Sequence, residues 1–168
     1  MQNFIFQNPV KIIFGRGSVA KLAPEAAKAG RKALLVYGGG SIKKNGVYQA
    51  LTAALAANGV TITEHPGVKP NPVLSHAREG IKKAVAEKCD LVIAAGGGSV
   101  IDEAKTIAAG ARYSGDVWDF FCGKTEPREA LPLFTVLTIP ATGSEMNAGC
   151  VLTIEETRQK YSAHSPFL

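Results

Sequence analysis

The segments ALLVYGGGS (33–41) and DLVIAAGGGS (90–99) decide the fold that the sequence predicts. In each of them a short apolar run ends abruptly at three glycines and a serine. Apolar runs of this length that are bounded by glycine are typical of strands buried on both faces of a parallel sheet. Two such segments in one chain therefore indicate repeated strand–turn–helix units.

The segments between the apolar runs have the spacing of amphipathic helices. We expect helices over 47–58, 73–88 and 100–111, and further strands over 60–63 and 133–139. Strands joined through helices of this length form βαβ units. The predicted fold class is α/β: a Rossmann-like, open and mostly parallel sheet with helices on both faces, in one domain over 1–168.

Three segments lie outside this pattern. Residues 4–14 hold two short apolar runs around Pro9, and we expect a short N-terminal hairpin or an added edge strand there. Residues 118–130 are rich in turn formers. Residues 160–168 contain neither a helix signal nor a polar tail, which is the appearance of a chain that has been cut.

Composition narrows the class of protein. The net charge of +5 comes from scattered lysines and arginines, so no basic stripe indicates nucleic-acid binding. The three cysteines have neither disulfide nor zinc spacing, and no apolar stretch reaches the length of a membrane span. We therefore expect a cytoplasmic protein that binds neither nucleic acid nor membrane.

The three histidines are predicted to be ordinary loop or surface residues. No two of His65, His76 and His164 lie four residues apart. Histidine pairs that bind a metal from one helix usually have that spacing. No metal-ligating residue is predicted in this chain.

The two glycine turns are candidates for ligand contact. Consecutive glycines after a buried strand leave no Cβ in the way of a ligand, and ligands collect at the carboxyl ends of parallel strands. The helix that follows directs free N–H groups at the same place, which favours phosphate. The G-x-G-x-x-G fingerprint is absent, so each turn could also be only a tight joint.

The polar residues beyond the strands have both structural and functional interpretations. Ser99 and Asp102 fit a capping box with Ser99 as the N-cap, and Thr142 and Glu145 fit another. Asp102 could instead accept a hydrogen bond from a neutral part of a ligand. Lys105 could lie on the surface or pair with Asp102, and a structural role is favoured.

Five stretches of the chain resemble one enzyme family. They are FGRGSVAKL (14–22), YGGGSIKKNGVY (37–48), KPNP (69–72), AAGGGSVIDEAK (94–105) and LTIPATGSEMNAGCV (137–151). The sequence is similar to the iron-containing alcohol dehydrogenase family, in the butanol dehydrogenase-like branch of NADPH-dependent aldehyde reductases. The resemblance implies a longer enzyme whose first part binds the nicotinamide dinucleotide.

The same resemblance implies that an all-helical second domain holds a divalent metal, iron or zinc. The family's metal ligands, an aspartate and histidines, lie in that domain, which is absent from this chain. The resemblance therefore implies no catalytic residue and no metal ligand within 1–168, and it assigns this chain to the dinucleotide-binding N-terminal domain.

The resemblance also assigns cofactor contacts residue by residue. Gly97, Gly98 and Ser99 would line the pyrophosphate, and Asp102 would lie near the ribose or carboxamide on the nicotinamide side. The residues that would surround the adenosine and ribose portions are Thr138, Thr142, Asn147 and Gly149. Lys160 would contact a ribose hydroxyl. Asn71, whose position between two prolines by itself indicates a turn, would help to close the adenine side.

The first turn bears on the choice of cofactor. Members of the family that prefer NAD have an acidic residue just after the first strand, where it binds the ribose 2′-hydroxyl. Here Gly38, Gly39, Gly40 and Ser41 occupy that place, and Lys43 and Lys44 follow. A hydroxyl and cations suit a 2′-phosphate, so we expect NADP(H) to be preferred over NAD(H).

The full enzyme is expected to transfer a hydride reversibly between NADPH and a small-molecule aldehyde, with the alcohol as product, and to work as a homodimer. The 168-residue chain alone is expected to have no appreciable turnover. Two alternatives stay open: a glycerol- or sugar-phosphate-dehydrogenase-like member of the superfamily, and a stand-alone nucleotide-binding module without catalysis.

Overall fold

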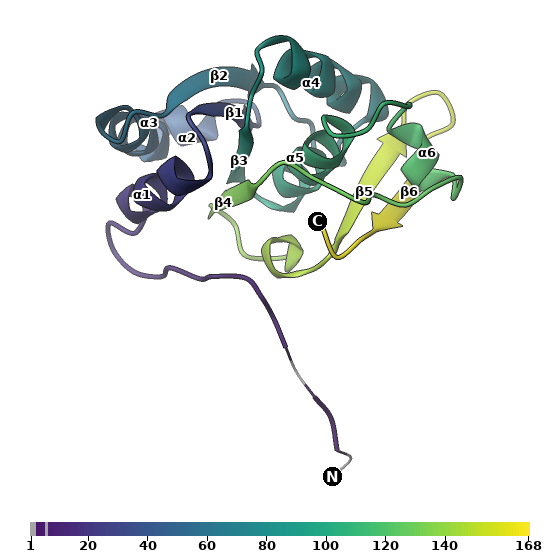
Figure 1. Ribbon diagram of the computed structural model, residues 1–168, viewed down its shortest axis with the longest axis horizontal. Coiled ribbons are helices and arrows are strands. Elements are labelled where there is room, and N and C mark those ends of the chain that lie inside the picture. The colour runs from purple at the N-terminus through teal and green to yellow at the C-terminus, as the bar shows by residue number, and fades with distance from the viewer. Residues whose placement is uncertain (1–2, 6) are drawn as a thin grey trace.

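A computed structural model describes residues 3–5 and 7–168 (Figure 1). Its central sheet has four parallel strands in the order β2-β1-β3-β4. The strands are β1 (Lys32–Tyr37), β2 (Thr61–Pro66), β3 (Leu91–Gly96) and β4 (Leu133–Leu137). The predicted parallel sheet is confirmed, and the two strands that end in triple glycine are its central, most buried members.

Helices cover both faces of the sheet, as predicted. On one face α1 (Val19–Ala29) and α3 (Val47–Ala57) pack against alternate residues of β1 and β3, such as Leu35. On the other face α4 (Leu74–Ala86) and α5 (Gly98–Gly110) pack against the intervening residues, such as Leu34. Side chains of successive strand residues point to opposite faces, so a continuous apolar strand serves two helical layers.

A hairpin that the sequence analysis did not predict forms a further layer beyond α5. It consists of β5 (Gly149–Ile154) and β6 (Gln159–His164), which pair antiparallel. Figure 1 shows this hairpin on the side of α5 away from the sheet. From Val100 to Gly110 every residue of α5 except Asp102 is buried, because the helix is covered on both sides.

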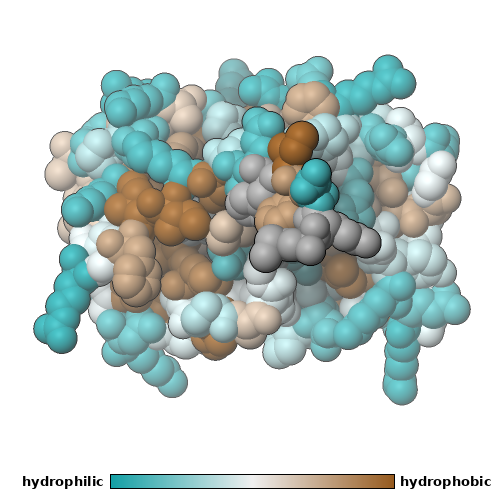
Figure 2. Space-filling view, turned by 90° about the horizontal axis from the view of Figure 1, so that it is seen from below, coloured by the Kyte–Doolittle hydropathy of each residue, from teal (hydrophilic) through white to brown (hydrophobic). Residues whose placement is uncertain are grey.

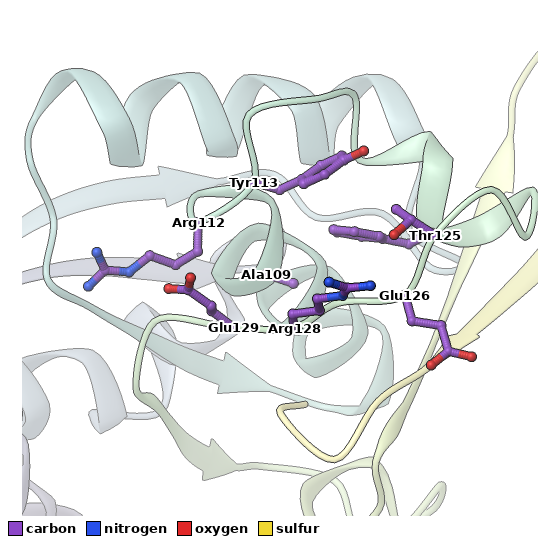
Figure 3. A pocket seen from close by; sticks show the side chains of 8 residues that line it. Ala109, Arg112, Tyr113, Thr125, Glu126, Arg128 and Glu129 are labelled. Carbon is purple, nitrogen blue, oxygen red and sulfur yellow. The ribbon is translucent and has the colours of Figure 1, made fainter.

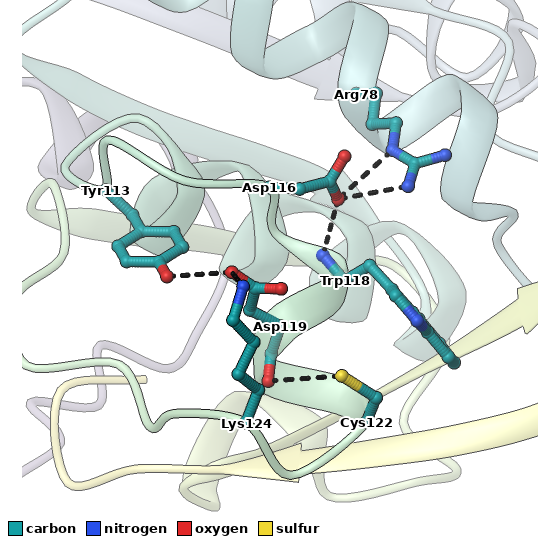
Figure 4. Close-up of polar contacts among 7 residues, drawn as sticks. All are labelled: Arg78, Tyr113, Asp116, Trp118, Asp119, Cys122 and Lys124. Atoms are coloured by element: carbon teal, nitrogen blue, oxygen red, sulfur yellow. Dashed lines mark hydrogen bonds and ion pairs between the residues drawn. The ribbon is translucent and has the colours of Figure 1, made fainter.

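Polar contacts hold the turn-rich segment that follows α5 (Figure 4). It contains the short helix α6 (Trp118–Phe121). The carboxylate of Asp116 accepts hydrogen bonds from the Arg78 side chain (3.0 Å) and from the first backbone N–H of α6 (2.8 Å). Asp119 pairs with Lys124 at 3.0 Å, which lowers the pKa of the Asp119 carboxyl. The segment is therefore anchored to α4 and to itself.

The hairpin or edge strand expected over 4–14 does not form in the described residues 4–5 and 7–14; residue 6 lies outside the description. These residues run as chain without strand pairing, and Ile5 and Phe14 are 98% and 97% exposed. The apolar runs predict burial, but the folded domain gives this segment no partner strand. Apolar surface is visible on the side of the molecule from which the segment projects (Figure 2).

Two further features agree with the composition. Within the described part of the chain the three cysteines are free thiols, with Cys89 and Cys150 buried and Cys122 exposed. Burial raises the pKa of the Cys150 thiol to about 11. Among the described residues, no helix is both long enough and apolar enough to cross a bilayer.

Candidate functional site

The two glycine turns meet at the carboxyl edge of the sheet. The strand order changes direction between β1 and β3, because β2 lies on one side of β1 while β3 and β4 lie on the other. Such a change opens a crevice at the carboxyl ends of the two strands, where α/β proteins bind their ligands. Gly38 lies beside Val100 of α5, so the first turn borders the helix that starts at the second.

The second turn leads directly into α5. The N–H groups of Val100 and Ile101 bond to the Gly97 carbonyl, at 3.0 and 3.2 Å. The N–H groups of Gly98 and Ser99 precede these first helical bonds, so they face outward at the positive end of the helix dipole. This is the arrangement that binds phosphate without a specialised side chain.

A polar loop lies against this helix start. Thr138 donates its N–H to the Gly96 carbonyl (3.0 Å). A Cβ placed on Gly98 would lie 2.3 Å from the Thr142 hydroxyl oxygen, so the loop and the helix can approach this closely only because residue 98 is glycine. The predicted Thr142–Glu145 capping box is wrong: Thr142 accepts the N–H of Ser144 (3.3 Å), and only the 3₁₀ helix η1 (Ser144–Met146) follows.

Ser99, Asn71 and Lys160 come together from three separate elements. The Asn71 N–H donates to the Ser99 hydroxyl (3.2 Å), and the Lys160 ammonium donates to the Asn71 side-chain oxygen (2.7 Å). Asn71 is left-handed, with φ 57°, a conformation that asparagine adopts more readily than most residues. The predicted role of Ser99 as N-cap is wrong, because Gly97 occupies the N-cap position two residues earlier and the Ser99 hydroxyl bonds to the loop.

Asp102 connects α5 to the polar loop and to the hairpin. Its carboxylate accepts a hydrogen bond from the Ser144 hydroxyl (2.6 Å) and one from the Val151 N–H (3.3 Å). It does not reach back to Ser99, so the capping-box interpretation fails on this side as well. Burial raises the pKa of Asp102, and the two hydrogen bonds oppose that shift.

Lys105 is neither a surface residue nor a direct partner of Asp102. It is buried and donates to the backbone carbonyls of Asn147 (2.6 Å) and Gly149 (2.9 Å) and to the Asn147 side-chain oxygen (3.1 Å). Burial lowers the pKa of Lys105. The structural role favoured from the sequence is confirmed. Asn147 and Gly149 therefore meet α5 through Lys105, and their cofactor contacts stay predictions.

The first turn is built differently. Gly40 is left-handed (φ 97°), the exposed Ser41 begins the short helix α2 (Ser41–Lys44), and open space surrounds Gly39. Lys43 of this helix lies 3.2 Å from the Glu64 carboxylate. It therefore already has an anionic partner, contrary to the expectation of a cation free for a 2′-phosphate.

Sequence reasoning missed Glu64, which lies near the end of β2. Its carboxylate accepts hydrogen bonds from the hydroxyls of Tyr37 and Tyr48, and these bonds lower its pKa. The Lys43 ammonium lies 5.1 and 4.5 Å from the centres of the two rings. Hydrogen bonding to Tyr37 and to Glu64 raises the pKa of Lys43. One sign of it was available in the sequence, because Glu64 directly follows the strand predicted over 60–63.

The histidines need a correction. His65 is buried at the end of β2, and its ring stacks on that of His76 in α4, with the ring centres 4.2 Å apart. Both contact the buried carboxylate of Glu103 in α5. The sequence could not show this, because the partner lies 38 residues from His65 and 27 from His76. His164 is exposed on β6, as expected.

A separate pocket lies at the opposite end of α5 (Figure 3). It is lined by both acidic and basic side chains, including Arg112, Glu126, Arg128 and Glu129. Ala109, near the last turn of α5, forms part of its wall. The pocket therefore lies away from the helix start where the predicted cofactor residues converge.

Comparisons with known proteins show what the chain is similar to. The model of the family "Iron-containing alcohol dehydrogenase" matches residues 9–168. The "Probable NADH-dependent butanol dehydrogenase 1" of Bacillus subtilis is 50% identical over 168 residues, which is all of this chain and 43% of the relative. The "NADPH-dependent aldehyde reductase YqhD" of Escherichia coli is 39% identical over 98% of this chain and 43% of the relative.

The crystal structure of NADH-dependent butanol dehydrogenase A from Thermotoga maritima superposes with a TM-score of 0.94 and 53% identity. It covers 99% of this chain, whereas this chain covers 42% of it. The chain thus spans about two fifths of the length of the relatives it matches. Over the superposed part, this chain and the Thermotoga maritima enzyme have the same fold.

Proposed function

The chain belongs to the iron-containing alcohol dehydrogenase family, and from that premise we propose that it is the NADP(H)-binding part of a metal-dependent alcohol dehydrogenase or aldehyde reductase. The observation that carries the proposal is the start of α5. There Gly98 and Ser99 present outward N–H groups beneath a loop of hydroxyl side chains. A pyrophosphate fits this place because its charge meets the helix dipole and its oxygens meet N–H donors.

The surrounding groups suit the sugars of the dinucleotide. The hydroxyl of Ser99, the amide of Asn71 and the ammonium of Lys160 form one hydrogen-bonded row beside the helix start. Asp102 is fixed by Ser144 and Val151, so its carboxylate is held at a defined angle for a ribose hydroxyl or a carboxamide. Within this row we assign Ser99 to the pyrophosphate, Lys160 to a ribose hydroxyl and Asn71 to the adenine side. Asp102 is assigned to the nicotinamide side.

The nicotinamide, when bound, supplies the hydride for a small aldehyde or accepts it from the alcohol. This chain's residues bind and orient the dinucleotide. The groups that converge at the start of α5 are N–H groups, hydroxyls, amides, a lysine and one carboxylate, a set that does not fit iron or zinc. The metal of the full enzyme therefore belongs, on this proposal, to residues beyond these.

The preference between the two cofactors rests on the first turn. No carboxylate occupies Gly38–Ser41, and the Ser41 hydroxyl and the Lys44 ammonium are exposed there. We propose that these groups favour the 2′-phosphate of NADP(H). The relatives are divided, since two of those compared are named for NADH and one for NADPH. The homodimer and the cytoplasmic location stay predictions.

Binding of the reduced cofactors to this chain tests the proposal. Titration followed by nicotinamide fluorescence is expected to give saturable binding of both, with a lower Kd for NADPH than for NADH. Binding of neither would contradict the proposed function, and a lower Kd for NADH would contradict only the preference. Aldehyde reduction by the purified chain is expected to be undetectable, and measurable turnover would contradict the assignment to cofactor binding alone.

A further inference from the structure

Three side chains with metal-binding atoms meet on the α4–α5 face of the sheet, apart from the residues assigned to the cofactor. They are His65 of β2, His76 of α4 and Glu103 of α5. One Glu103 oxygen, Oε1, lies 3.2 Å from His65 Nε2 and 2.6 Å from His76 Nδ1. The side chains of Glu103 and His65 are 0% and 4% exposed, and that of His76 is 21% exposed.

The carboxylate of Glu103 needs positive charge in this place. A buried carboxylate is costly unless it is paired and hydrogen-bonded. Among the described residues, Oε1 meets only the two ring nitrogens, and Oε2, which is also buried, has no hydrogen-bond partner at all. The unpartnered oxygen Oε2 is an independent indication that a ligand binds here.

The hydrogen bonding of His76 indicates which nitrogen is available. Its Nε2 lies 3.1 Å from the Pro66 carbonyl, which can only accept a hydrogen bond, so Nε2 carries the proton. Nδ1 is then the nitrogen that can present a lone pair, and it faces the Glu103 oxygen at 2.6 Å. A metal ion bound by both atoms would hold them further apart than this, so the contact would have to open as the ion entered. Histidines that bind metals commonly donate their other ring N–H to a backbone carbonyl in this way.

We propose that His65, His76 and Glu103 bind a divalent transition-metal ion, with Zn²⁺ as the preferred species. Two imidazoles and a carboxylate are a known zinc ligand set. The three donor atoms already lie within 4.8 Å of one another. Protons on the two ring nitrogens would satisfy Oε1 alone, whereas a metal ion would join both nitrogens and could also engage the unpartnered Oε2.

The site would have a defined geometry and a defined effect. The two rings are stacked with 27° between their planes, so the partly exposed His76 tilts out of the stack when both nitrogens point at one ion. A water would supply the remaining ligand from that exposed side. The ion would join β2, α4 and α5, so its binding would stabilise the folded state.

Metal titration of the intact 168-residue chain tests the proposal. After removal of metal with a chelator, Co²⁺ is expected to give the visible absorption of a low-symmetry four-coordinate site, saturating at one equivalent. Zn²⁺ is expected to abolish that absorption and to raise the Tm. Zn²⁺ that leaves the Tm unchanged, or Co²⁺ that remains fully hydrated, would overturn the proposal and leave only a hydrogen-bonded cluster.

Variants keep the test decisive. His76→Asn removes a ligand that is partly exposed, so the chain is expected to fold while its Co²⁺ affinity falls by at least the roughly ten- to hundredfold that loss of an outer-shell partner costs. Glu103→Gln is expected to lose the same absorption. His164→Asn removes an exposed histidine outside the cluster and is expected to bind as the parent does. Equal loss in His164→Asn, or full Co²⁺ binding in folded His76→Asn, would refute the site.

Discussion

The two Gly-Gly-Gly-Ser turns have the same four residues but meet different physical requirements. In the first turn Gly40 is left-handed, and open space surrounds both Gly39 and Gly40. In the second turn no glycine has a positive φ, but a Cβ on Gly98 would lie 2.3 Å from a Thr142 side-chain atom. The first turn therefore needs glycine for its backbone conformation, and the second needs it for space.

The helices that follow differ in the same sense. The first turn begins the four-residue helix α2, which is exposed except for Ile42. The second turn begins the 13-residue helix α5, which is covered on both sides. Because α5 is longer, it has the larger aligned dipole, and because it is packed on both sides, its N-terminus is held in place. A repeated motif in a sequence is thus not a repeated site in the structure.

Adding a methyl group to each turn is the strongest test of this difference. Gly98→Ala is expected to push Thr142 away from the helix start, to weaken NADPH binding by at least roughly tenfold, and to lower the free energy of unfolding by about 1–3 kcal/mol. Gly39→Ala is the matched control, and it is expected to change the free energy of unfolding by less than about 0.5 kcal/mol. Isothermal titration and urea unfolding measure both. Equal effects of the two variants would mean that the turns are equivalent.

Asp102 offers a pH test of the second turn. Because burial holds its pKa above the ordinary value of 3.8, the folded state binds this proton more tightly than the unfolded state. Its contribution to stability is therefore largest below the unfolded pKa and is lost as the pH rises through the folded pKa. Asp102→Asn removes this titration.

The stability of the parent relative to Asp102→Asn is accordingly expected to be greatest in acid. The difference between their free energies of unfolding should fall as the pH rises toward neutral. Urea unfolding of both proteins at several pH values measures the difference. A difference that stays constant, or that grows toward neutral pH, would show that the two hydrogen bonds outweigh burial.

Glu64→Gln should have the smallest effect and acts on the first turn. The Glu64 side chain is 36% exposed, so after allowance for solvent screening the loss of stability is expected to be about 1 kcal/mol or less. Its pKa is lowered, so the carboxylate stabilises the fold above the unfolded pKa and this contribution is lost as the pH falls.

The same variant would release Lys43 from its partner. The ratio of NADPH affinity to NADH affinity is expected to rise roughly two- to fivefold, the size of one exposed charge contact. Ser41→Ala, which leaves Lys43 and Glu64 in place, serves as the comparison. An unchanged ratio in Glu64→Gln would mean that Lys43 lies out of reach of the ribose phosphate.

The sequence was most informative where a segment's surroundings are uniform. Strands β1 and β3 are buried on both faces, so their apolar runs predicted both the strands and their parallel neighbours. The hairpin β5–β6 was missed because it mixes exposed and buried residues, and four of the six residues of β6 are exposed. Helix α1 was missed as well, and it contains Pro24.

For the site, local patterns suggested partners that the tertiary structure replaced. Ser99 and Asp102 have the spacing of a capping box, yet they bond to Asn71 and Ser144, which are 28 and 42 residues away. Hydrogen bonds over such separations have no periodic signal in one sequence. The grouping of Ser99, Asn71 and Lys160 was expected only from the family resemblance, and the structure brings these three residues together.

The double cover of α5 has a consequence for synthesis on the ribosome. The sheet side of this helix can be covered by β1 and β3, which precede it in the chain, but its other side is covered by the hairpin that ends at His164. About fifty residues separate Gly110 from His164. At ordinary elongation rates the newly made helix therefore keeps an apolar side bare for roughly 3–10 seconds, an interval in which a chaperone can bind it.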